Sequence, residues 1–318
     1  MKTPYYVFKE KKFKELLLKY KHFGEVFYPI KANDDPAIIE RVIGANCAFE
    51  VDSIEHIKLL IEGYNVRPNK IIYSFPLKKS YDIVTASELG VTKFVVDCIE
   101  EYNNIRAHAK SPEYILRINA NSVVGGLNSM QDKWGFPLDD LKNAYRIITA
   151  NNDNVLGISF YLSSEINSQE NFVKIFDAIE SLNIHNIEVV DIGGGVSVEM
   201  LERLDEKLKL FKQRVGFERL IIEPGRHLLD PCIDFAVSVI ARRPANDGNN
   251  ILFIDAGIYY GLLDVIIKEK RFDIIEENEN KDKALFYVCG FSSDVSDLIG
   301  KYMLNIDIKV GDKLIFKN

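Results

Sequence analysis

The chain has 318 residues, of which 47% are hydrophobic and 27% are charged, a composition typical of globular proteins with ample material for a core. Its 40 basic and 47 acidic residues give a formal net charge of -7 without a basic cluster, which argues against a nucleic-acid-binding protein. No apolar run approaches the ~20 residues of a membrane span, and residues 1–10 lack the apolar stretch of a signal peptide, so we expect a cytoplasmic protein.

From residue 25 onward, short β-rich runs alternate with amphipathic helical stretches. We expect strands at Glu25–Ile30, Cys47–Val51, Lys70–Ser74, Lys93–Asp97, Tyr114–Ile118, Val155–Tyr161, Ile187–Asp191 and Leu220–Ile222. Strands separated by helices predict βαβ units with parallel strands, and eight of them predict an α/β fold of the (β/α)8 TIM barrel type. An open doubly wound sheet is the alternative, but no GxGxxG segment follows the first strand.

The pattern changes after Arg226, where strands follow one another without convincing helices between most of them. The runs that indicate strands are Ile233–Ala241, Ile251–Asp255, Leu285–Cys289 and Lys313–Phe316. We therefore expect a barrel at residues 24–230 and a second, mainly antiparallel β domain at residues 231–318. Residues 1–12 can join that domain through the run Tyr5–Phe8.

The cysteines are widely spaced along the chain, at Cys47, Cys98, Cys232 and Cys289. None forms a CxxC pair, which excludes a zinc ribbon and a dithiol redox motif. We expect reduced thiols and no metal site.

Chemically distinctive residues follow three of the predicted strands. In TIM barrels the active site lies at these strand ends. Lys31 follows the first strand, where partial desolvation would make its amine a better nucleophile toward an aldehyde. The glycine triplet 193–195 and Arg226 suit a phosphate group, and Glu223 suits a heteroaromatic nitrogen. Taken singly, these are a surface lysine, a tight turn and a surface ion pair. Together they predict a phosphorylated aldehyde cofactor.

Several segments resemble the ornithine/diaminopimelate/arginine decarboxylases, which are pyridoxal-phosphate enzymes of fold type III with an alanine-racemase-like barrel. Residues 27–33 (FYPIKAN) resemble the family's FYAVKAN, residues 49–53 (FEVDS) resemble FDxxS, and residues 71–78 (IIYSFPLK) resemble IIYANPCK. The later matches follow in the family's order: 116–118 with LRI, 133–135 with KFG, 159–164 with SFHVGS, 191–195 with the GGG box, 223–226 with EPGR, 255–259 with NDGVY and 290–294 with GPTCD. The chain is thus identified as a short, divergent member. The family continues into GAY where this sequence ends at residue 318, which indicates either a shortened β domain or one domain of a larger protein.

The resemblance implies roles in cofactor binding. Lys31 would bind pyridoxal 5'-phosphate covalently, and Glu50 would lie near that link. Glu223 would pair with the pyridine nitrogen, and Tyr161, which replaces a family histidine, would stack on the ring. The phosphate would be held by Gly193, Gly194, Gly195, Arg226 and Ser164.

The resemblance also implies a homodimer with shared sites, in which Ser293 and Asp294 act in the partner subunit's site. Ser293 replaces the family cysteine that returns a proton after decarboxylation. The substrate would lie near Asp294, Tyr259 and Lys268, and Lys268 aligns with an aspartate that holds a diamine's distal ammonium.

These implications predict a decarboxylase (carboxy-lyase) that acts on an α-amino acid group. A cation at Lys268 disfavours free ornithine. Compact relatives act on the amino acid head of a larger conjugate, such as a peptide conjugate in microcin C-type antibiotic biosynthesis, and we expect a substrate of this kind. A pyridoxal-phosphate racemase and a catalytically silent regulatory homologue are the alternatives.

Overall fold

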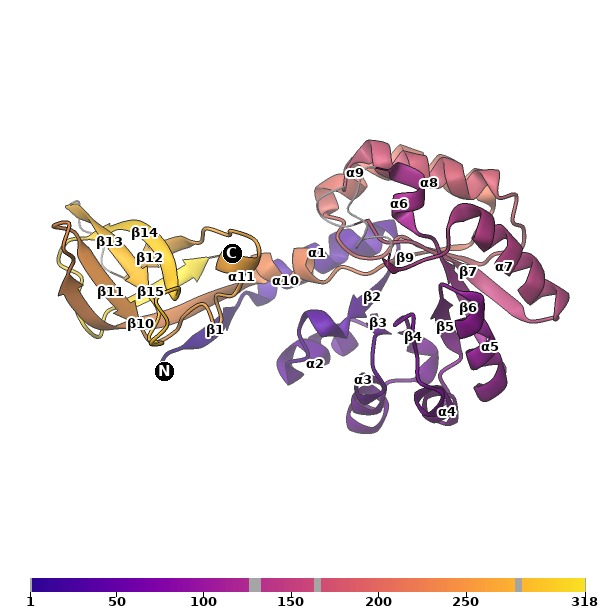
Figure 1. The fold of residues 1–318 in the computed structure, drawn as a ribbon, viewed down its shortest axis with the longest axis horizontal. Helices are drawn as coiled ribbons and strands as arrows, with labels where there is room; N and C mark the ends of the chain where they lie inside the picture. The colour runs from indigo at the N-terminus through magenta and orange to yellow at the C-terminus, as the bar shows by residue number, and fades with distance from the viewer. Residues whose placement is uncertain (1, 126–132, 163–166, 278–281, 318) are drawn as a thin grey trace. The chain divides into compact units, whose positions relative to one another are not determined.

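The computed structural model describes residues 2–125, 133–162, 167–277 and 282–317. The chain divides into two compact units, one formed by Leu16–His227 and the other by Met1–Glu15 together with Leu228–Asn318. The first unit contains the barrel strands β2–β9 with helices around them, and the second consists mainly of β strands (Figure 1).

The strands of the first unit form a closed barrel in which each strand pairs in parallel with the next, and β2 pairs with β9 to close it. They are β2 (Glu25–Pro29), β3 (Ala48–Val51), β4 (Ile71–Tyr73), β5 (Lys93–Val96), β6 (Glu113–Arg117), β7 (Asn154–Ser159), β8 (Val189–Asp191) and β9 (Arg219–Ile222). This confirms the predicted (β/α)8 barrel.

Helices connect successive barrel strands and lie outside them (Figure 1). The α-helices are α1 (Glu10–Phe23), α2 (Pro36–Gly44), α3 (Ile54–Lys58), α4 (Ser80–Glu88), α5 (Ile99–His108), α6 (Ala120–Val124), α7 (Leu138–Ala150), α8 (Gln169–Ser181), α9 (Val198–Val215) and α10 (Arg226–Leu229). The short helical turns are η1 (Ile30–Ala32), η2 (Leu59–Gly63) and η3 (Pro68–Lys70). Local signals fix the helix ends: in α9 the N-cap Ser197 accepts the Met200 N–H, and Gly216 ends the helix in the left-handed conformation.

The barrel interior is filled by one buried apolar side chain from each strand. These side chains are Phe27, Ala48, Ile72, Val95, Ile115, Leu156, Val189 and Ile221. Because they form one cluster contributed by all strands of a closed barrel, they pack across its axis. The barrel is therefore closed by side chains below its C-terminal mouth.

The second unit is built around β10 (Ile233–Pro244), which is long enough to pair with three strands. Its first half is antiparallel to β1 (Tyr5–Phe8) and β15 (Lys313–Lys317), and its second half to β11 (Asn250–Ile254). The remaining elements are β12 (Asp273–Glu276), β13 (Lys283–Cys289), β14 (Leu298–Asn305), α11 (Asp264–Ile267) and η5 (Asp230–Cys232). The strand order is β12-β15-β10-β11-β13-β14, with β11 and β13 parallel and the other described pairs antiparallel. The predicted antiparallel domain is confirmed, including the N-terminal strand.

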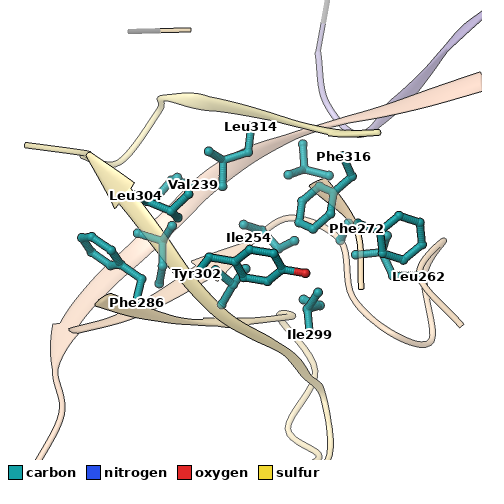
Figure 2. Close-up of a cluster of buried hydrophobic side chains, with 14 of the residues drawn as sticks. Val239, Ile254, Leu262, Phe272, Phe286, Ile299, Tyr302, Leu304, Leu314 and Phe316 are labelled. Carbon is teal, nitrogen blue, oxygen red and sulfur yellow. The ribbon is translucent and has the colours of Figure 1, made fainter. Parts of the chain in front are cut away.

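Side chains from most of these strands form a second hydrophobic core (Figure 2). Its labelled members are Val239, Ile254, Leu262, Phe272, Phe286, Ile299, Tyr302, Leu304, Leu314 and Phe316. Each unit thus has a hydrophobic core of its own.

As predicted, all four cysteines are free thiols. Across the part of the chain that the structure describes, every helix is too short or too polar to cross a membrane.

Candidate active site

A ring of polar side chains lies at the C-terminal mouth of the barrel. Alternate residues of a strand face the same side, so the residue two positions after each core residue also faces the barrel axis. This rule gives the apolar Pro29 on β2 and Ile158 on β7. The other six strands contribute polar side chains, which are Glu50 on β3, Ser74 after β4, Asp97 after β5, Arg117 on β6, Asp191 on β8 and Glu223 after β9. Carboxylates therefore predominate at the mouth.

Lys31 lies in η1, directly after β2, and forms an ion pair with Glu50. Its Nζ donates to Glu50 Oε1 at 2.9 Å; the lysine side chain is 52% exposed and the glutamate side chain 1%. Burial lowers the pKa of Lys31, but the charge and hydrogen bond of Glu50, with the charges of Glu223 and Asp52, outweigh it and leave the pKa above its ordinary value. Lys31 thus reaches solvent at the barrel mouth while a buried carboxylate holds its ammonium form.

The Glu50 carboxylate receives a second donor, the hydroxyl of Ser74, on the same oxygen Oε1. The other oxygen, Oε2, is buried and has no hydrogen-bond partner among the described residues. Glu50 is therefore held on one side and left with a free acceptor on the other.

Asp191 and Glu223 form a pair of hydrogen-bonded carboxyl groups. Asp191 is 1% exposed, and its Oδ1 accepts the Gly193 N–H at 2.8 Å. Burial raises the pKa of Asp191 to about 6, whereas burial and the charges of Asp191 and Glu50 raise the pKa of Glu223 well above its usual value. A hydrogen bond between two carboxyl groups needs a proton on one of them, so the pair shares a proton.

The glycine triplet 193–195 connects β8 to α9. Gly193 and Gly195 have φ of +66° and +77°, and a Cβ on any of the three would lie 2.6–2.9 Å from a backbone carbonyl oxygen. Only glycine fits there. The N–H groups of Gly194 and Gly195 stay open to close approach, whereas that of Gly193 donates to Asp191. A glycine loop that leads into the N-terminus of the 18-residue helix α9 is suited to bind an anion.

Three further residues are predicted to bind the cofactor. Tyr161 is 45% exposed, and its ring carbon Cε2 lies 3.4 Å from the position that a Cβ on Gly195 would take. Arg226 is exposed at the first residue of α10. Ser164 lies outside the described residues.

The predicted substrate residues lie in the β unit. The Tyr259 hydroxyl donates to Asp294 Oδ2 at 3.0 Å. Hydrogen bonds from the Ser296 N–H and hydroxyl, and then from Tyr259, lower the pKa of Asp294, so it stays ionised at neutral pH. Ser293 is exposed beside Asp294, whereas Lys268, exposed at the end of α11, has no hydrogen bond or ion pair to Tyr259 or Asp294 in the described structure.

Motifs in the sequence indicate roles for Lys31, Glu50 and Glu223 but none for Ser74 or Asp191. Both of these residues end predicted strands, and the alternation rule, counted from the core residues, would have placed both side chains in the mouth. The signal for Ser74 and Asp191 is therefore their position in each strand and not a family motif.

Comparison with known proteins supplies a family. The family model "Pyridoxal-dependent decarboxylase, pyridoxal binding domain" matches residues 9–230. Ornithine decarboxylase of Schizosaccharomyces pombe is 25% identical over 286 residues, which are 86% of this chain and 63% of that protein. Decarboxylase flvG of Aspergillus flavus is 26% identical over 249 residues, 73% of this chain and 58% of that protein. The chain thus spans less than two thirds of the length of these two relatives.

The structure of the arginine decarboxylase of Paramecium bursaria Chlorella virus has the same fold. It superposes with a TM-score of 0.88 at 22% identity, and the match covers 100% of this chain and 91% of that one. The barrel and the β domain together therefore form an architecture already known from an enzyme structure.

Proposed function

The chain belongs to the pyridoxal-dependent decarboxylases, whose cofactor is pyridoxal 5'-phosphate, and from this premise we propose that it decarboxylates an α-amino acid group. One observation carries the proposal. A solvent-reaching lysine, a proton-holding carboxyl pair and an anion-binding glycine loop all lie at the same end of one barrel. Each of these features suits a different functional group of one cofactor: the lysine its aldehyde, the carboxyl pair its pyridine nitrogen and the glycine loop its phosphate.

The residues present fit that cofactor. Lys31 is accessible to an aldehyde, and the glycine loop has no side chain that would block a phosphate. The raised pKa of Glu223 provides a carboxyl group that exchanges a proton with a pyridine nitrogen. The buried, donor-free Oε2 of Glu50 leaves an acceptor in the site.

When bound, the cofactor supplies a ring that accepts the electron pair left behind as CO₂ departs from the substrate. The chain's own residues bind it and manage protons. Lys31 would hold it covalently, the N–H groups of Gly194 and Gly195 together with Arg226 would bind its phosphate, and Tyr161 would stack on its ring. Glu223 would hold a proton at the ring nitrogen, and the buried carboxyl group of Asp191 would support that glutamate.

The second part of the proposal concerns proton return and the subunit arrangement. We place Ser293 as the group that returns a proton to the substrate carbon, in place of the family's cysteine, and Asp294 as an ionised acceptor for a hydrogen-bond donor of the substrate. Asp294 suits that task because its pKa is lowered and it is exposed. Both residues act in the partner's site of a homodimer, as the resemblance implies.

The third part concerns the substrate. Lys268 presents an exposed cation, which repels the distal ammonium of ornithine. We therefore propose a substrate whose α-amino acid head is carried on a larger conjugate without that ammonium, as in microcin C-type biosynthesis. Lys268→Ala is expected to increase the turnover of ornithine relative to that of the true substrate.

The function is tested with purified protein and added pyridoxal phosphate. Mass spectrometry of a panel of free amino acids and amino-acid conjugates should reveal one that loses CO₂. Cofactor binding with inversion at Cα and no CO₂ release would indicate a racemase, and the absence of any bound cofactor would indicate a silent homologue. Either result refutes the proposal.

A further inference from the structure

Glu50 is oriented by two donors that come from different strand ends. Its Oε1 accepts from Lys31 Nζ at 2.9 Å and from the Ser74 hydroxyl. Ser74 is itself fixed, because its N–H donates to the Val51 carbonyl at 2.8 Å. Since Oε2 has no partner in the described part of the chain, no other described group orients the carboxylate.

Both residues of this contact depart from the family patterns that the sequence otherwise follows. The family's FDxxS has aspartate where this chain has Glu50, and IIYANPCK has alanine where it has Ser74. Glutamate carries its carboxylate one methylene further from the backbone, on one more rotatable bond, and alanine has no donor to restrain it. Because the Ser74 hydroxyl is hydrogen-bonded to the Glu50 carboxylate, it restricts the additional side-chain freedom that glutamate has at this position.

We propose that Ser74 is a positioning residue whose hydroxyl fixes the Glu50 carboxylate against Lys31. The hydroxyl acts through Glu50 and does not contact the amine itself. The proposal rests on the proposed function in one respect, namely that Lys31 is the amine that binds the cofactor.

The contact matters because Glu50 decides the protonation of Lys31. Burial alone lowers the pKa of Lys31, and Glu50 is the largest of the opposing contributions. The other charged groups around this pair are Glu223 and Asp52, which act on Lys31, and Asp191 on β8 and Arg117 on β6. Releasing Glu50 would shift Lys31 toward the neutral amine, the form that reacts with an aldehyde.

The test measures the reactivity of Lys31 in cofactor-free protein, without any turnover. The protein is pulse-labelled with a trace of acetic anhydride over a range of pH. Mass spectrometry follows acetylation of Lys31, with the exposed Lys207 as internal standard. Ser74→Ala is expected to raise labelling of Lys31 near neutral pH about fivefold and to move its midpoint to lower pH. Ser74→Thr, which keeps the hydroxyl, should restore the wild-type value.

A double-mutant cycle separates positioning from packing. In the Glu50→Asp variant the side chain is one methylene shorter, so its carboxylate no longer reaches the Ser74 hydroxyl. Adding Ser74→Ala should then have little further effect on the labelling of Lys31. The matched control is Ser159→Ala, which removes a buried hydroxyl at the end of β7 that has no hydrogen-bond partner among the described residues and should leave labelling unchanged. Ser74→Cys, with its weak donor, replaces the alanine variant if that variant folds poorly.

Unchanged labelling in folded Ser74→Ala, or an equal effect of Ser74→Ala in the Glu50→Asp background, would overturn the proposal. Failure of the proposed function has a different signature. In that case Lys31 labelling would respond as expected, but added pyridoxal phosphate would not protect Lys31 from acetylation.

Discussion

Replacing Asp191 by asparagine is expected to change how the stability of the cofactor-free barrel depends on pH. Asparagine keeps the oxygen that accepts the Gly193 N–H but cannot ionise. The pKa of Asp191 is raised by burial from 3.8 to about 6 in the folded chain. A group with a raised folded pKa contributes stability that is fully present below its unfolded pKa and is lost as pH rises through its folded pKa.

The size of the effect follows from that separation. At 1.36 kcal/mol for each pKa unit, about 2 units amount to about 3 kcal/mol of unfolding free energy. The wild type loses this unfolding free energy as the pH rises from about 4 to about 7. Roughly half of the loss occurs above about pH 5, so a comparison of pH 5 with pH 8 captures that half. The stability of Asp191→Asn relative to wild type should therefore rise by roughly 1 to 2 kcal/mol between those two conditions.

Urea unfolding of cofactor-free protein, followed by tryptophan fluorescence, measures this difference. The only tryptophan of the chain, Trp134, lies in the barrel unit, so its emission reports on that unit. Asp97→Asn is the matched control, because Asp97 also ends a barrel strand and accepts a glycine N–H, from Gly135 at 3.2 Å, but is not among the main charges acting on Asp191 or Glu223. Parallel pH profiles for wild type and Asp191→Asn would refute the buried carboxyl pair.

Three further outcomes test the cofactor site. Lys31→Ala should lose both the absorbance of lysine-bound cofactor and the activity, and cofactor still trapped on the chain by borohydride would contradict the assignment. Glu223→Gln should bind pyridoxal phosphate with nearly unchanged affinity but slow decarboxylation by several orders of magnitude, because an amide cannot keep the ring nitrogen protonated; near-normal turnover would show that Glu223 faces elsewhere. Mixing Lys31→Ala with Asp294→Ala should restore about a quarter of wild-type activity, since half of randomly exchanged dimers contain one intact site. Failure to recover activity after verified subunit exchange would favour sites within one chain.

The barrel could be predicted strand by strand because each strand is a compact apolar run between amphipathic helices. The β domain was predicted less completely, and β12 and β14 were missed. β12 has four residues and pairs only with β15, so it is half-exposed and its sequence lacks an apolar run. β14 contains Gly300 and has the apolar Leu298 and Met303 at exposed positions, so its sequence lacks the apolar–polar alternation that identifies a strand.

The candidate site divides in the same way. Lys31, Glu223 and the glycine triplet follow strand ends in recognisable motifs, so the sequence alone indicates their chemistry. The interaction of Ser74 with Glu50 joins residues 24 positions apart, and that of Asp191 with Glu223 joins two successive strands of the closed barrel. Such pairings depend on barrel register and side-chain direction, which apolar periodicity in one sequence does not specify.

The pairing of β1 with β10 has a consequence for synthesis on the ribosome. The barrel unit Leu16–His227 is continuous in sequence, whereas Tyr5 must wait for Ala236 before it has a partner. The emerging chain can therefore complete the barrel, with its glycine triplet 193–195, before the β domain exists, while its first strand remains an unpaired edge that can pair with a wrong strand. Until β10 leaves the exit tunnel, β1 is therefore the segment for which chaperone binding would be most useful.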